Sequence, residues 1–127
     1  MHLPVKAHVA VVDGAHFSLF RNSGTEQLPE LSHVEMATQP ELAHSAGQAD
    51  SPRQNEEAGH AASVASALNA AVLANKIDHL VVIADPSTLG EMRKLYHKSL
   101  EQKLVGEIAK TLTGHSTDDL LKAIANG

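Results

Sequence analysis

The fold is decided by His79-Leu-Val-Val-Ile-Ala-Asp85, in which five apolar residues follow one another between two polar ones. A short apolar run that is rich in β-branched side chains is typical of a strand buried on both faces. Pro86 follows directly and ends the strand, because proline cannot donate a hydrogen bond to a neighbouring strand. The stretch therefore predicts an interior strand of a sheet that is covered by helices.

Three further strands are predicted upstream of this run. The first spans Val5–Val12, and Asp13-Gly14 follows as a hairpin turn, since both residue types tolerate positive φ. The second strand spans Ala15–Arg21, and the polar stretch Asn22-Ser23-Gly24 forms the next turn. A third strand spans Leu31–Ala37. These segments together predict an antiparallel meander.

One helix is predicted before the interior strand and one after it. Apolar residues at helical spacing predict the first helix over Ala58–Lys76. The second helix runs to about His97, and its start has two interpretations. Thr88-Leu-Gly-Glu91 has the spacing of a capping box, whereas Asp85-Pro86 would place a cap and then a proline at the first helical position.

The last two predicted elements are a strand and a helix. Apolar and polar residues alternate in Lys103–Ala109, which predicts a strand with Leu104, Gly106 and Ile108 on one face. Ser116-x-x-Asp119 has capping spacing and opens a C-terminal helix.

The order of these elements is β-β-β-α-β-α-β-α. It indicates a single α/β domain over residues 1–127, with a five-stranded mixed sheet and three helices. Right-handed crossovers place the fourth strand beside the first, which is the ribonuclease H-like topology. Thr38–Glu57 is polar and follows no helical or strand period, so a long loop is predicted there.

The composition of the 127-residue chain excludes several classes of protein. It contains no cysteine, which excludes a disulfide scaffold and a thiol nucleophile. No apolar run approaches the roughly 18 residues of a membrane span, and no signal peptide is visible, so a cytoplasmic protein without membrane insertion is expected. The net charge of −5 disfavours non-specific binding to nucleic acid, and no DNA partner is expected.

Three stretches of the chain carry a family resemblance. His79–Lys94, Leu104–Thr113 and Val9–Arg21 resemble the bacterial host attachment protein family. The resemblance implies a non-enzymatic interaction protein that is required for attachment to host cells. The family's fold resembles the middle domain of eukaryotic and archaeal peptide-chain release factors. The same resemblance therefore implies an alternative, a release-factor-like protein that associates with the ribosome or with RNA.

The release-factor comparison draws attention to Ala46-Gly47-Gln48 in the polar loop. Release factors carry Gly-Gly-Gln in this loop, where flexible glycines present the glutamine to the peptidyl ester. Here the first glycine is alanine and the flanking residues are not basic, so a chance match of three letters is the competing interpretation. Gly47 and Gln48 are retained as candidate binding residues.

Asp13 and Asp85 form a second candidate site, because each follows a strand of the predicted parallel pair. Ribonuclease H-like nucleases hold two magnesium ions with carboxylates at comparable places. A nuclease needs further acids, and only Glu56 or Glu57 is available. The competing interpretation is structural, since Asp13 suits a turn and Asp85 suits a helix start.

The basic residues Arg93, Lys94, Lys98 and Lys103 form a third candidate, a binding surface for RNA or protein. The competing interpretation is a solvated helix face on which Glu91 pairs with its basic neighbours. The nine histidines show no zinc-ligand spacing, so no metal or other cofactor is expected apart from magnesium under the nuclease alternative. The expected partner is an unidentified protein or the ribosome, and an edge strand could also pair two copies into a homodimer.

Overall fold

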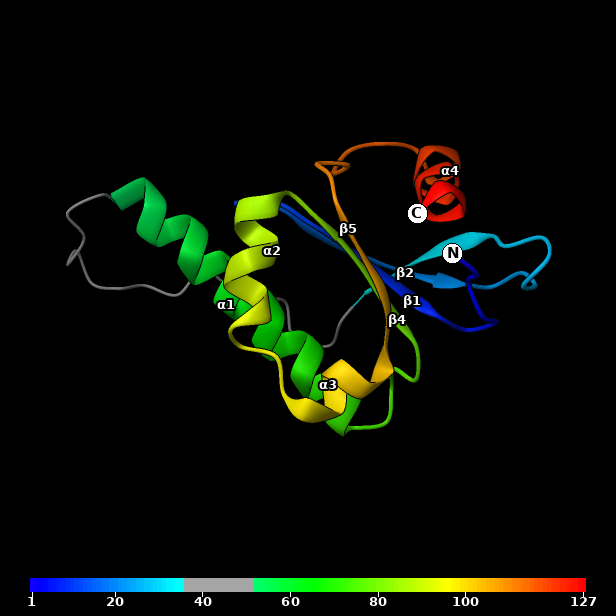
Figure 1. Cartoon of the computed structure of the whole chain (residues 1–127), viewed down its shortest axis with the longest axis horizontal. Coiled ribbons are helices and arrows are strands. Elements are labelled where there is room, and N and C mark those ends of the chain that lie inside the picture. Colours follow the sequence, from blue (N-terminus) through cyan, green and yellow to red (C-terminus); the bar gives the residue numbers. More distant parts are fainter. Residues whose placement is uncertain (36–51) are drawn as a thin grey trace.

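The computed structural model describes residues 1–35 and 52–127, and the side chains of residues 1–35 and 58–127. Its strands are β1 (His8–Val12), β2 (Phe17–Asn22), β3 (Leu31–Val34), β4 (Leu80–Ala84) and β5 (Leu104–Ala109). Its helices are α1 (Pro52–Leu73), α2 (Pro86–Arg93), α3 (Lys98–Lys103) and α4 (Thr117–Asn126). Figure 1 shows α1, α2 and α3 on one side of the twisted sheet and α4 on the other.

The sheet is mixed and has the strand order β3-β2-β1-β4-β5. The hairpin partners β1–β2 and β2–β3 are antiparallel, whereas β1–β4 and β4–β5 are parallel. Val9 lies opposite Val81 and Val12 lies opposite Ala84, and every residue of β1 and β4 is buried. The predicted α/β class, the five-stranded mixed sheet and the interior strand beside β1 are confirmed.

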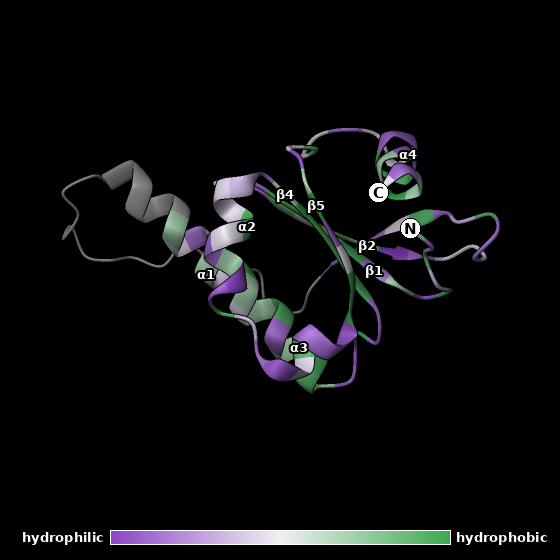
Figure 2. Ribbon diagram, viewed as in Figure 1, coloured by the Kyte–Doolittle hydropathy of each residue, from purple (hydrophilic) through white to green (hydrophobic). Residues whose placement is uncertain are grey.

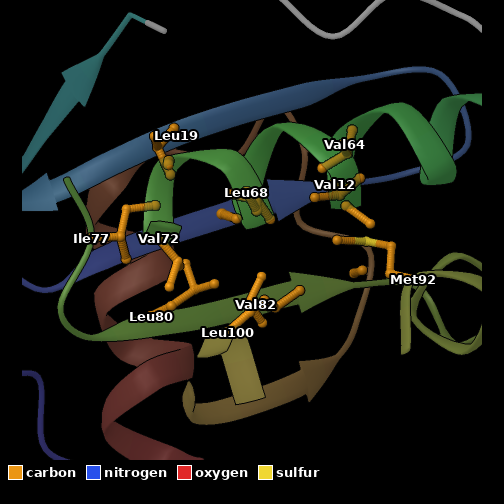
Figure 3. Packing of buried hydrophobic residues seen from close by; sticks show 14 of the residues in the cluster. Val12, Leu19, Val64, Leu68, Val72, Ile77, Leu80, Val82, Met92 and Leu100 are labelled. Carbon is orange, nitrogen blue, oxygen red and sulfur yellow. The ribbon is translucent and has the colours of Figure 1, made fainter. Parts of the chain in front are cut away.

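Two hydrophobic clusters cover the two faces of the sheet. The first lies under α1, α2 and α3, and Figure 3 shows its packing. The second lies under α4 and includes Val9, Val11 and Ile83. Successive residues of β1 and β4 contribute alternately to the two clusters, because neighbouring side chains of a strand point to opposite faces. Figure 2 shows hydrophobic residues along the inner strands and hydrophilic ones over much of α3.

The connection between β4 and β5 contains two helices rather than the single one predicted. α2 ends at Arg93, and the short α3 begins at Lys98. Between them, the buried amide of Asn69 on α1 donates from Nδ2 to the carbonyl oxygen of Leu95 at 2.9 Å and accepts from the N–H of His97 at 3.0 Å. These bonds satisfy backbone groups that a continuous helix would otherwise pair internally.

The starts of α1 and β1 differ most from prediction. α1 begins at Pro52 rather than Ala58, and proline suits a first helical position because the N–H it lacks has no partner there. The loop predicted over Thr38–Glu57 therefore overlaps the first turns of α1. β1 begins at His8 rather than Val5, since Lys6 has a φ of 67° and cannot belong to an extended strand.

The start of α2 is settled in favour of Asp85. Its backbone is extended, with φ −62° and ψ 155°, and its Oδ2 accepts a hydrogen bond from the N–H of Thr88 at 3.1 Å. Pro86 is the first residue of the helix. Thr88 is buried inside the helix, so the alternative start at Thr88 is wrong.

A β-bulge in β5 overturns the predicted common face of Leu104, Gly106 and Ile108. Leu80 pairs with Leu104, but Val81 pairs with Gly106, so one additional residue, Val105, enters the strand. Leu104 packs against the cluster under α1–α3, whereas Ile108 belongs to the cluster under α4. An additional residue shifts every later side chain to the opposite face, which sequence alternation does not reveal.

Among residues 1–35 and 52–127, no helix has both the length and the hydropathy that a membrane crossing requires.

Candidate functional site

Four segments of the chain meet where the parallel strands β1 and β4 end. Because Val12 lies opposite Ala84, Asp13 and Asp85 both leave the sheet at this carboxyl end of the strands. The loop after β5 contributes Thr113, and α1 contributes His60. Ligands of open α/β sheets usually bind at the carboxyl ends of the strands. The prediction that both aspartates follow neighbouring parallel strands is therefore confirmed.

Asp13 organises the turn between β1 and β2. Its Oδ1 accepts hydrogen bonds from the N–H groups of Ala15 at 2.8 Å and His16 at 2.6 Å, and its Oδ2 accepts one from the hydroxyl of Thr113 at 2.5 Å. Within the described residues, neither Asp13 nor Gly14 has a positive φ. The predicted turn is present, but the reason given for it is wrong, since the Asp13 carboxylate holds the turn.

His16 and His60 join this arrangement, and sequence reasoning missed both. Nδ1 of His16 lies 3.0 Å and 3.1 Å from the two carboxylate oxygens of Asp13, although 74% of the His16 side chain is exposed. When this nitrogen carries the proton, Nε2 is the free acceptor of the ring. Nε2 of the buried His60 donates to the carbonyl oxygen of His16 at 3.0 Å and so ties α1 to the hairpin. The Asp-x-x-His spacing across the turn was the available signal for His16, whereas His60 lies 44 residues from His16 and had no such local signal.

The side chain of Asp85 caps α2 through one carboxylate oxygen, and its other oxygen makes no hydrogen bond among the described residues. Oδ2 caps the helix, and Oδ1 is buried with no hydrogen-bond partner among the described residues. Within that part of the chain, no group of three or more histidine, aspartate or glutamate side chains is placed to hold a metal ion. The side chains of Glu56 and Glu57 lie outside the description. The geometry therefore supports structural roles for both aspartates.

Hydrogen bonding keeps the Asp13 carboxyl ionised. Its partial burial raises the pKa, but the hydrogen bonds from Thr113, from the N–H groups of Ala15 and His16 and from the His16 ring outweigh this effect. The pKa of Asp13 falls from 3.8 to about 2 as a result. Because the folded state binds this proton less tightly than the unfolded chain, the carboxylate stabilises the fold above pH 3.8. This stabilisation is lost as the pH falls from 3.8 towards 2.

Replacing Asp13 with asparagine is expected to lower the free energy of unfolding by about 1–2 kcal/mol at pH 7, a value reduced for the remaining solvent contact. The asparagine keeps the shape but removes the charge that Thr113 and His16 contact. Urea unfolding between pH 2 and pH 7 would measure the difference from the wild type, which should shrink below about pH 4. Glu35→Gln, at an exposed position after β3 and outside any helix, is the matched control. An equal loss at pH 2 and pH 7 would contradict the charge argument.

The four basic residues of the third candidate are not equivalent. Arg93 forms an ion pair with Glu107 of β5, with Nε 3.1 Å and 3.2 Å from the two carboxylate oxygens. Lys94 pairs with Glu91 at 3.3 Å, as the solvated-face interpretation predicted. Lys98 and Lys103 have no ion pair in the described part of the chain. Among the described residues, two of the four cations could therefore meet a ligand without first losing an acidic partner.

The remaining candidate residues, Gly47 and Gln48, lie outside the described residues. The family model described as bacterial archaeo-eukaryotic release factor family 12 matches residues 32–124 of the chain. The chain belongs to this family. The release factor family 12 match begins in β3 and ends in α4, so it includes Gly47, Gln48 and the basic residues of α2 and α3, whereas Asp13 and His16 precede it. A search of the curated proteins found no match.

Proposed function

We propose that this chain is a ribosome-associated protein of the release-factor type. The observation that carries the proposal is its membership of release factor family 12 over residues 32–124, which is most of the chain. The prediction of a release-factor-like relation is confirmed by this match. Ribosome or RNA contact is our inference from it, and attachment to host cells stays a prediction of the earlier resemblance.

The charge distribution favours a small contact surface rather than an extended RNA-binding face. The chain carries a net charge of −5, which disfavours broad phosphate binding. Lys98 begins α3 and is exposed, and Lys103 ends it, and both lack an acidic partner among the described residues. The proposed ribosome contact therefore lies on α3 and the end of α2, and it includes Lys94 directly after α2, whose pairing with Glu91 is exposed and weak.

Gly47 and Gln48 are proposed as a second contact that binds without catalysing hydrolysis. In release factors the corresponding motif has two glycines before the glutamine. Alanine at position 46 restricts the backbone, because only glycine adopts positive φ without steric cost. A motif with reduced freedom is better suited to binding than to presenting a backbone group to a reacting ester.

The joint variant Lys94→Glu, Lys98→Glu and Lys103→Glu is expected to weaken co-sedimentation with 70S ribosomes by about tenfold or more at low salt. The matched control carries the same charge change at Lys6, Lys76 and Lys122, which are exposed elsewhere on the molecule. The control should retain association. Equal loss in both variants would indicate a net-charge effect, and unchanged association in the first would overturn the proposed surface.

A further inference from the structure

β5 is an edge strand, and its outer side pairs with no other strand of the described chain. It is the last strand in the order β3-β2-β1-β4-β5. In Figure 1, β5 passes in front of the other strands and no helix crosses over it. Leu104 to Glu107 are half-buried, whereas every residue of β4 is buried. Such an edge presents backbone N–H and C=O groups that another extended chain can pair with.

The charges at this edge leave an excess of positive charge. Lys103 comes directly before β5 and Lys110 directly after it, and neither side chain has an ion pair or hydrogen bond in the part of the chain described. The acid of the strand itself, Glu107, is engaged by Arg93, whose Nη2 also lies 3.1 Å from the carboxylate. A positive charge therefore stands at each end of β5, and the negative charge between them is neutralised.

We propose that the outer edge of β5 is a docking site for an extended acidic segment of a partner protein, which adds a strand to the sheet. Backbone hydrogen bonds to β5 provide the affinity, and Lys103 and Lys110 select acidic side chains. The bulge at Val105 lies within the strand and sets the register that the added segment meets. This proposal concerns the isolated protein and does not depend on ribosome association.

The same charges disfavour a second copy of this chain as the occupant. Antiparallel pairing of two β5 strands would bring the lysine at one end of β5 against the lysine at the opposite end of the other copy. Like charges directly opposite one another destabilise a strand pair. With an acidic strand, the side chains opposite Lys103 and Lys110 are negative, so both lysines attract the added strand and contribute to binding.

Single-stranded RNA fits the edge less well than an acidic peptide does. Nucleic-acid grooves of this kind combine cations with aromatic side chains on which bases stack. Tyr96 is the aromatic residue nearest in sequence to β5, but its hydroxyl is buried and its ring packs against the cluster under α1–α3. The unpaired backbone groups of β5 match the spacing of another backbone, not that of phosphates.

The test uses the purified full chain and a fluorescein-labelled octapeptide of alternating valine and glutamate with blocked ends. Fluorescence anisotropy at low salt should show that this peptide binds at least about tenfold more tightly than an octapeptide of alternating valine and lysine. Hydrogen exchange of the β5 amides should slow when the glutamate peptide is bound. Absence of binding, equal binding of the two peptides, or slowed exchange at another segment would overturn the proposal.

Two variants assign the binding to this edge. Lys103→Glu with Lys110→Glu should weaken binding of the glutamate peptide by about tenfold or more, whereas Lys76→Glu with Lys122→Glu should leave it unchanged. A dimer that the lysine variant strengthens, or oligouridine that displaces the peptide, would overturn the assignment in favour of those occupants.

Discussion

Replacing Asn22 with leucine is expected to lower the free energy of unfolding by about 3–4 kcal/mol. Asn22 is fully buried at the end of β2. Its Oδ1 accepts hydrogen bonds from the N–H groups of Gly24 at 3.0 Å and Glu30 at 3.1 Å. Leucine has a similar volume but cannot accept either bond, so both N–H groups would lose their partner.

The donor side of the Asn22 amide adds to this effect. Nδ2 lies 3.1 Å from the carbonyl oxygen of Leu3 and 3.2 Å from that of Thr25, with Pro4 slightly farther away at 3.3 Å. One side chain therefore joins the N-terminal segment to the loop between β2 and β3. Buried polar groups that lose their only partner cost more than the net value of the bond they made.

Chemical denaturation of Asn22→Leu would measure the loss, with Asn126→Leu as the control, because Asn126 is exposed near the end of α4. The control should change the free energy of unfolding by less than about 0.5 kcal/mol. Amide hydrogen exchange of Gly24 and Glu30 should accelerate in Asn22→Leu. A loss below about 1 kcal/mol with unchanged exchange would mean that water replaces the amide without cost.

Replacing Leu68 with alanine is expected to cost about 3–4 kcal/mol, because the side chain is fully buried between α1 and the sheet. Figure 3 shows Leu68 between Val64 and Val72 on α1, facing Val12 and Val82 of the sheet. The cavity left behind removes packing contacts for both layers. Alanine is a slightly better helix former than leucine, so the loss arises from packing and not from the helix itself.

Leu73→Ala is the matched control for this prediction, since it makes the same substitution on the same helix. The side chain of Leu73 lies at the end of α1 and is 56% exposed. The control should therefore cost less than about 1 kcal/mol in the same denaturation experiment. If both variants lowered the free energy of unfolding by similar amounts, the packing of Leu68 between α1 and the sheet would not be the source of the predicted loss.

The candidate site was predictable only in part. The sequence placed Asp13 and Asp85 after neighbouring strands, because the parallel pairing of Val9–Val12 with Val81–Ala84 follows from hydrophobic pattern and crossover handedness. It did not indicate the hydroxyl of Thr113, which is 100 residues away from Asp13 in the chain. Hydrogen bonds between side chains from distant loops leave no periodic signal in a sequence.

Local pattern also failed where a single residue changed the geometry. Alternation in Lys103–Ala109 predicted a regular strand, but Val105 has no partner on β4 and shifts the later side chains to the other face. Asn22 was assigned to a turn by its type, whereas the structure buries it as the last residue of β2. In both cases the neighbours that decide the outcome are separated from the residue along the chain.

The sequence by itself determined the class of fold and the interior position of Leu80–Ala84, because both depend on short-range hydrophobic pattern. It also narrowed the start of α2 to two possible caps, because helix-end chemistry is local. Only the tertiary structure decided which charges remain unpaired. Arg93 on α2 and Glu107 on β5 meet only in the folded chain, and this contact leaves Lys103 and Lys110 as the charges beside β5 that have no ion pair among the described residues. Such pairings depend on how the layers pack, since two side chains can neutralise each other only when the fold brings them within a few ångströms.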